Sequence, residues 1–221
     1  LDSKTFLTGY STSLYVSEKN IYLTPQKSID YSLYAEKYFN DVAIPLLPQD
    51  EKLSAVMQSD DDVYTRLSHV QELLYQHSLS LEGTEKELFD EQFKELQEAF
   101  ELRMSKETEK TVIQKISVDD NEINFEKTGE VPGTVLNQFS MDEHDGYFRI
   151  ATTTGNWREI SLNHLYVLND DLEIVGSVED LAQGERIYSV RFIEDKVYMV
   201  TFRQVDPLYV IDVSNPRAPE V

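Results

Sequence analysis

The sequence predicts a mainly β fold with one helical insertion, and two observations support that prediction. One sequence pattern recurs three times: two short runs of β-branched and aromatic residues flank a tight polar turn, which is typical of β-hairpins. Between the first and second copies, the periodicity changes from alternating to helical. The three copies are Ser13–Thr24, Phe139–Thr152 and Ser189–Thr201.

The spacing of the copies indicates an interrupted array of one repeated unit. When the turns are aligned, Ile21, Tyr147 and Val197 are equivalent, and the last two lie 50 residues apart. The first interval is longer by about the length of the helical stretch, Ser28–Lys110. Four antiparallel strands in roughly 40–50 residues make one blade of a β-propeller. We therefore expect a partial β-propeller of about 2.75 four-stranded antiparallel blades.

The expected domain organisation has three parts. Residues 1–27 begin the first blade, and residues 28–110 form a small helical hairpin or bundle inserted in it. Residues 111–221 supply the rest of the first blade, a complete second blade and an incomplete third blade.

The strands follow from runs of strand-forming residues separated by Asp, Asn and Gly, which tolerate turn conformations. The strings His164–Asn169 and Pro207–Asp212 are nearly identical, so we expect them to be the third strands of successive blades. Their continuous apolar runs predict strands covered on both faces. A further strand of the last blade should start near Glu220. The predicted strands are Thr12–Ser17, Asn20–Pro25, Thr111–Val118, Glu122–Thr128, Gln138–Asp142, Tyr147–Thr153, His164–Leu168, Leu172–Val178, Tyr188–Ile193, Lys196–Phe202 and Leu208–Val213.

The first half of the insertion carries helix start and stop signals. Asp30 can cap a helix through about Val42, and Pro45 and Pro48 should end it. A short helix is expected over Glu51–Gln58.

Two longer helices complete the predicted insertion. Polar and acidic residues at Ser59–Asp62 precede a helix with an apolar stripe. Thr84 and Glu87 form a capping-box pattern ahead of a last helix with a second stripe. The first stripe comprises Val63, Leu67, Val70, Leu74 and Leu81, and the second comprises Phe89, Phe93, Leu96 and Phe100.

Composition restricts the classes of partner. The 221 residues include 20 basic and 41 acidic ones, a net charge of −21 that repels nucleic acid and anionic lipid headgroups. The chain has no cysteine, which excludes disulfides, thiolate nucleophiles and cysteine-ligated metals.

No apolar run approaches a transmembrane length and no signal-peptide pattern is present, so direct membrane insertion is not expected. Because the chain begins at Leu1, we expect it to be a processed or excised piece.

Three segments carry a resemblance to a known family: Val131–Asp142, Arg149–Thr154 and Ile187–Pro216. They resemble archaeal and bacterial secreted proteins that carry a C-terminal β-propeller domain distantly related to WD repeats. The resemblance implies a piece from the interior of a longer propeller that works outside the cytoplasm. Since the family has no established activity, the resemblance implies no catalytic residues.

Two loops hold the candidate ligand-binding residues. Arg203, Gln204 and Asp206 lie between two strong strands and could face a ligand, although an Asp in such a loop more often fixes its turn. Trp157 lies in a segment longer than a hairpin needs and could contact a sugar or a peptide, with packing onto a blade edge as the alternative.

The four histidines and the acidic clusters predict no metal site. His77 falls on the apolar stripe of its helix and is expected to be a buried neutral histidine. His69, His144 and His164 show no metal-ligand spacing. Helix capping and turn chemistry account for the acidic clusters, none of which has the spacing of a calcium loop. We therefore expect no cofactor, with calcium as the alternative. The clusters are Asp60–Asp62, Asp119–Glu122, Asp142–Asp145 and Asn169–Asp171.

A strong repeat signal without a catalytic motif favours a non-enzymatic, extracellular scaffold for a protein or carbohydrate ligand. A carbohydrate- or peptide-active hydrolase is the first alternative, with carboxylates from several blades at the central channel of the full propeller. A calcium-dependent surface adhesin is the second. Unpaired blade edges also predict either a homodimer or an exposed sheet covered by the acidic helices.

Overall fold

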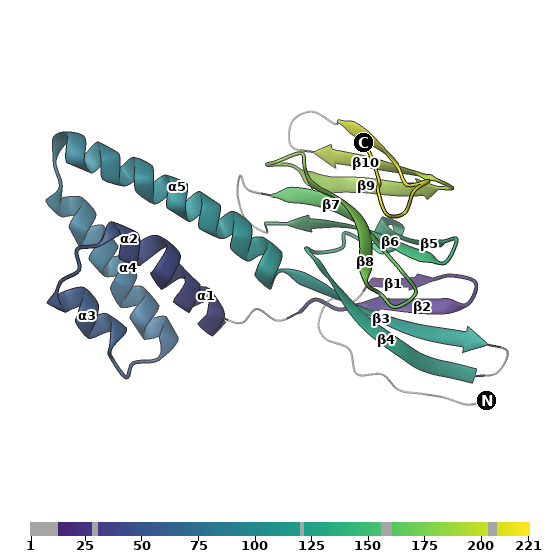
Figure 1. Ribbon diagram of the computed structural model, residues 1–221, viewed down its shortest axis with the longest axis horizontal. Coiled ribbons are helices and arrows are strands. Elements are labelled where there is room, and N and C mark those ends of the chain that lie inside the picture. Colours follow the sequence, from purple (N-terminus) through teal and green to yellow (C-terminus); the bar gives the residue numbers. More distant parts are fainter. Residues whose placement is uncertain (1–12, 28–30, 120–121, 156–160, 203–206) are drawn as a thin grey trace. The chain divides into compact units, whose positions relative to one another are not determined.

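The computed structural model describes residues 13–27, 31–119, 122–155, 161–202 and 207–221. The chain forms two compact units (Figure 1). One unit combines Leu1–Ser28 with Ser105–Val221 and contains the strands, and the other, Ile29–Met104, is helical. This mainly β architecture, with three antiparallel sheets and a group of helices, agrees with the predicted fold class.

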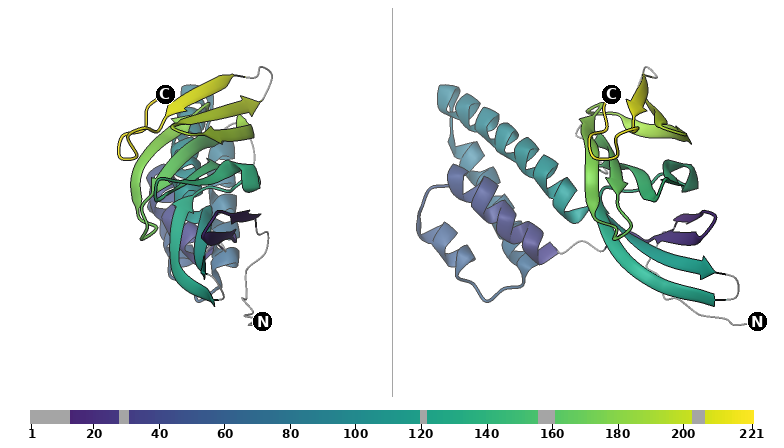
Figure 2. Two further views of the ribbon diagram at one scale, coloured as in Figure 1. Left: turned by 90° about the vertical axis from the view of Figure 1, so that its right-hand side faces the viewer. Right: turned by 45° about the vertical axis from the view of Figure 1, so that its right-hand side comes forward.

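Each sheet is an antiparallel meander in which consecutive strands pair (Figures 1 and 2). The first sheet has the order β1-β2-β3-β4, the second β5-β6-β7-β8 and the third β11-β10-β9. The helices α1 to α5 lie between β2 and β3 along the chain. The strands are β1 (Ser13–Val16), β2 (Asn20–Thr24), β3 (Lys110–Asp119), β4 (Glu122–Pro132), β5 (Met141–His144), β6 (Tyr147–Thr154), β7 (Leu162–Leu168), β8 (Ile174–Leu181), β9 (Arg186–Ile193), β10 (Lys196–Phe202) and β11 (Leu208–Asp212).

The expected strands are found, and two of them begin two or more residues later than predicted. The strand predicted from Gln138 begins at Met141, because Gln138–Ser140 forms the 3-10 turn η2 and Asn137 caps it through Phe139 N–H. The strand predicted from Leu172 begins at Ile174, because Leu172 has a φ of 59° in the preceding turn.

The third sheet continues past β11 as predicted. Glu220 forms an antiparallel bridge with Asp212, through N–H···O bonds of 2.7 and 3.0 Å. The prediction that β11 is covered on both faces is wrong, since Leu208 and Val210 are exposed. The homodimer expected from unpaired blade edges stays a prediction.

The second sheet is packed on both of its faces. Phe148 and Ile150 face residues of the first sheet, whereas Ala151 and Leu165 belong to a core shared with the third sheet. Atoms of the neighbouring sheet approach two glycines so closely that a larger side chain would clash. A Cβ on Gly129 would lie 2.6 Å from Leu172 Cβ, and one on Gly176 would lie 2.2 Å from Pro216 O.

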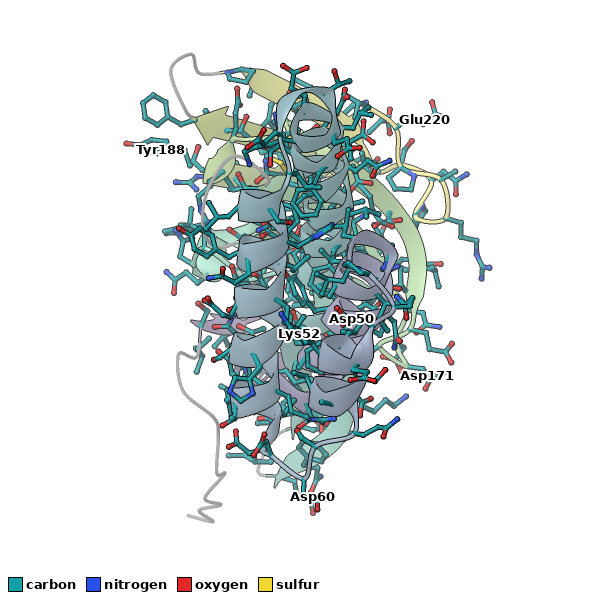
Figure 3. The ribbon with its side chains drawn as sticks, turned by 90° about the vertical axis from the view of Figure 1, so that its left-hand side faces the viewer. Asp50, Lys52, Asp60, Asp171, Tyr188 and Glu220 are labelled. Atoms are coloured by element: carbon teal, nitrogen blue, oxygen red, sulfur yellow. The ribbon has the colours of Figure 1, made fainter. Side chains whose placement is uncertain are left out.

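The helical unit has its own core. Its elements are α1 (Tyr31–Tyr38), the π-helical turn η1 (Phe39–Ala43), α2 (Ile44–Leu46), α3 (Glu51–Met57), α4 (Val63–Ser80) and α5 (Gly83–Thr108), the last of which continues into the β unit. Asp50 caps α3 and Asp62 caps α4, each by accepting two backbone N–H bonds. Acidic Asp60, in the loop before α4, is exposed to solvent (Figure 3). The buried residues of the unit include Phe39, Val42, Val70, Leu74, Phe89, Phe100 and Met104.

Three predictions about the helices are wrong. Pro45 does not end the first helix, because it lies in the first turn of α2, where its missing N–H costs little. Thr84 is not a cap, because α5 already begins at Gly83. His77 is only partly buried and packs edge-on against Phe89, with ring centroids 5.4 Å apart. Asp30, the predicted cap of the first helix, lies outside the described residues.

Candidate functional site

The first strands of the three sheets border a groove with a volume of about 430 Å³. The 3-10 turn η2 lies at its centre, since η2 contacts both β1 and β9. The groove therefore collects equivalent strands from the three repeats. It is lined by Leu14, Tyr15 and Val16 from β1, Gln138 and Phe139 from η2, Met141 and Asp142 from β5, and Arg191 and Phe192 from β9.

Tyr15 fixes β1 against β5 at one wall of the groove. Its hydroxyl accepts a hydrogen bond from Glu143 N–H at 3.1 Å. Its ring lies 6.3 Å from that of Phe148, which stacks on Tyr22 at 4.1 Å. Burial raises the pKa of Tyr15 above its ordinary value, so the hydroxyl stays protonated at neutral pH.

The carboxylate of Asp142 is already bound to a buried cation. Arg149 is 4% exposed and donates from Nε to Asp142 Oδ2 at 2.9 Å. A second nitrogen of Arg149 donates to the carbonyl of Glu194 at 2.6 Å, and the guanidinium lies 5.4 Å from the Phe192 ring. Asp142 therefore contributes to a link between the second and third sheets.

Arg191 differs from Arg149 in the groups that it contacts. Its guanidinium lies over Phe139, 4.5 Å from the ring centroid, and one nitrogen donates to the carbonyl of Val190 at 2.7 Å. Within the described residues it has no carboxylate partner. Phe139 is half exposed, as are Leu14 and Val16. The groove thus offers apolar surface beside a positioned guanidinium.

The predicted ligand-binding residues Arg203, Gln204, Asp206 and Trp157 lie outside the described residues. The groove residues were not singled out from the sequence. No pattern within one repeat distinguishes them, because the groove forms only where residues of three repeats come together.

A second polar cluster surrounds His164 in the middle of β7. Potential ligand atoms of His164, Glu179 and Asp180 lie within 4.8 Å of one another, which could suggest a metal site. His164 is fully buried, and its Nδ1 accepts the Asp180 backbone N–H at 3.2 Å. Nε2 must then carry the proton of the neutral ring and donates to Thr154 Oγ1 at 2.9 Å.

Lys106 supplies the positive charge that a metal would bring to this cluster. Its ammonium lies 2.6 Å from Asp180 and 3.4 Å from Glu179. Burial, together with the charge of Lys106, lowers the pKa of His164 to about 4, so the ring is neutral at pH 7. With both ring nitrogens bonded, His164 joins β6, β7 and β8 and leaves no ligand atom free.

The acidic turn at Asn169–Asp171 also has cationic partners. Asp170 bonds Lys115 at 2.5 Å, and this contact lowers the pKa of Asp170. Asp171 pairs with Lys127. These contacts link the turn between β7 and β8 to β3 and β4, so the turn serves as an inter-sheet connection and offers little to calcium.

The comparisons with known proteins agree with this architecture. A family model described as a beta propeller domain matches residues 1–221. The chain belongs to the β-propeller domain family.

Two curated relatives come from archaea. An uncharacterized protein of Methanocaldococcus jannaschii is 36% identical over 221 residues, which cover 96% of this chain and 35% of that protein. An uncharacterized protein of Archaeoglobus fulgidus is 36% identical over 211 residues, which cover 94% of this chain and 33% of that protein. The chain thus spans about a third of the length of these relatives.

No solved structure matches the chain significantly. In the described part of the chain, no helix combines the length and apolar character needed to cross a membrane.

Proposed function

We propose that this β-propeller domain is a non-enzymatic binding module and that the groove on β1, β5 and β9 is its ligand site. The observation that supports this function is the composition of the groove: half-exposed Leu14, Val16 and Phe139 beside the guanidinium of Arg191. Aromatic and arginine side chains of this kind dominate binding energies at protein interfaces. The ligand is a protein or a carbohydrate.

Hydrolysis is less well supported by the same groove. A glycosidase of the common type needs two carboxyl groups across the scissile bond, one of which donates a proton. Among the described lining residues only Asp142 carries a carboxyl group, and that carboxylate is bound by Arg149. The described lining thus lacks the second carboxyl group that this mechanism needs.

We further propose that each sheet is a propeller blade, with the helical unit inserted between the second and third strands of the first. Closed propellers have four to eight blades, so closure around a channel requires blades beyond these three. In such a ring the first strands of the blades face the channel, which would place the groove there. The resemblance to secreted propeller proteins supports a location outside the cytoplasm.

Binding screens on glycan and peptide arrays test the proposed function. A bound ligand should lose at least about tenfold in affinity with Phe139→Ala, since buried aromatic contacts in interfaces are worth 2 kcal/mol or more. Tyr75→Ala is the matched control, because Tyr75 is a similarly exposed aromatic on α4, in the helical unit. Equal loss in both variants, or turnover of a substrate in a broad hydrolase screen, would contradict the proposal.

A further inference from the structure

We infer that the groove recognises an extended peptide that carries a carboxylate, with Arg191 as the anion-binding residue. This inference rests on the proposed function and names its ligand class. Three features of the groove support it. Among the described residues the guanidinium of Arg191 has no carboxylate partner, the outer edge of β1 is open, and the charge of Asp142 is neutralised by Arg149.

Among the described residues Arg191 has no carboxylate partner, although the chain has twice as many acidic as basic residues. Many other cations of the described residues are ion-paired, as an acid-rich chain predicts. Arg149 on β6 binds Asp142, and Lys196 on β10 binds Asp212. Further pairs involve Lys27, Lys86, Lys106, Lys115 and Lys127.

The surroundings of Arg191 also fix its orientation. The ring of Phe139 supports one face of the guanidinium, and the carbonyl of Val190 takes one N–H group. The remaining N–H donors form the planar fork that binds a carboxylate in a bidentate manner. Because the guanidinium is already held in position, the Arg191 side chain loses less conformational entropy when a ligand binds it.

An extended peptide matches the shape of this site. Within the described residues β1 pairs with β2 alone, so its outer edge offers backbone N–H and C=O groups to an added strand. Leu14 and Val16 alternate along β1 and are 47% and 58% exposed, which suits apolar side chains of a ligand strand. The peptide thus supplies backbone and apolar contacts along β1 and a carboxylate to Arg191.

The acidic groups beside the groove already bind partners within the protein. The charge of Asp142 is offset by Arg149. The carboxylate of Glu143, the next residue on β5, accepts hydrogen bonds from Asn20 Nδ2 at 2.9 and 3.1 Å. Both carboxylates are therefore satisfied inside the protein.

A displayed library of random peptides with free C-termini provides the probe. Each selected peptide is synthesised twice, once with its carboxylates and once with Gln, Asn and a C-terminal amide in their place. We expect the amide form to bind the native protein at least about tenfold more weakly, as loss of a charge-assisted hydrogen bond predicts. Arg191→Gln should weaken the acid form by a similar factor and leave the amide form unchanged.

Two further variants complete the design. Arg217→Gln removes the same charge from the loop after β11, away from the groove lining, and should leave both affinities unchanged. Leu14→Glu removes an apolar contact and adds a carboxylate to the groove, so it should weaken the acid form more than the amide form, which provides a second route if Arg191→Gln fails to fold.

The outcomes separate this inference from the proposed function. Equal binding of the acid and amide forms, with loss only in Phe139→Ala, overturns carboxylate recognition and keeps the groove as a binding site. A glycan that binds through the groove while no peptide does overturns the peptide class. Absence of any ligand for the folded protein overturns both.

Discussion

Two strands with nearly the same sequence, β7 and β11, lie in different surroundings. His164–Asn169 reads HLYVLN and Pro207–Asp212 reads PLYVID, and both segments form the third strand of an antiparallel meander. Every residue of β7 is buried, whereas in β11 Leu208 is 58% exposed and Leu165, its equivalent, is 0% exposed.

The difference shows that the repeated sequence determines strand formation and that neighbouring sheets determine burial. The second sheet has cores on both faces, formed with the first and third sheets. In the third sheet, Ile211 is fully buried while Val210, next to it, is 42% exposed. The described residues thus cover only one face of β11.

The largest effect expected from this difference is a change in unfolding free energy. Leu165→Ala removes a fully buried side chain and leaves a cavity, which should cost about 3–5 kcal/mol. Leu208→Ala, the matched control, should cost less than about 0.5 kcal/mol, since it changes an exposed position. Urea unfolding of both variants measures the difference. Similar costs would mean that β11 is covered in solution and would remove the contrast.

Much of the β architecture could be predicted from the sequence because its signals are local. The turn at Asp145 and Gly146, with φ of 50° and 78°, uses residues that tolerate left-handed conformations. Burial could be predicted only in part, because it depends on residues far away in the chain. Helical periodicity pointed to His77, yet the buried histidine is His164, which bonds Thr154 and the backbone of Asp180.

The groove was harder to predict for a related reason. Phe139 and Arg191 belong to copies of the repeated hairpin pattern, and that pattern indicates only strands. Their contact, 4.5 Å from guanidinium to ring centroid, joins two repeats and arises only when η2 packs against β9. A pattern within one repeat carries no information about such a contact.

His164 gives a second way to test the contrast, because the equivalent position just before β11 is Pro207. The folded pKa of His164 is about 4, below the 6.5 of an unfolded histidine. Between about pH 6.5 and pH 4 the unfolded chain therefore binds a proton at this histidine while the folded chain does not. The contribution of neutral His164 to the free energy of unfolding should be fully present above about pH 6.5. It should be lost as the pH falls toward 4, by at most about 3 kcal/mol.

Urea unfolding from pH 7 to pH 5 measures this loss. His164→Gln is the control: it lacks the titrating ring, and the other histidines are present in both proteins. The native protein should lose more stability than His164→Gln over the same interval. Parallel pH profiles would show that His164 is protonated in the folded state or is exposed to solvent.

The smallest expected effect concerns the last position of the two strings, Asn169 and Asp212. Asn169 Oδ1 accepts Glu173 N–H at 2.9 Å, and Asp212 Oδ1 accepts Ser214 N–H at the same distance. Asp212 also pairs with Lys196, its register partner on β10, and this contact together with Ser214 holds the pKa of Asp212 well below its ordinary value.

Asp212→Asn keeps the oxygen that accepts the turn bond and removes the ion pair. Because both side chains of the pair are well exposed, solvent screens their attraction, and the melting temperature should change by about 1 °C or less. The stabilisation from a carboxylate with a lowered pKa is present at neutral pH and lost on acidification, so any difference should vanish at low pH. A shift of several degrees at pH 7 that persists in 1 M salt would show that this pair is shielded from solvent, and β11 would then resemble β7 more closely than its exposure indicates.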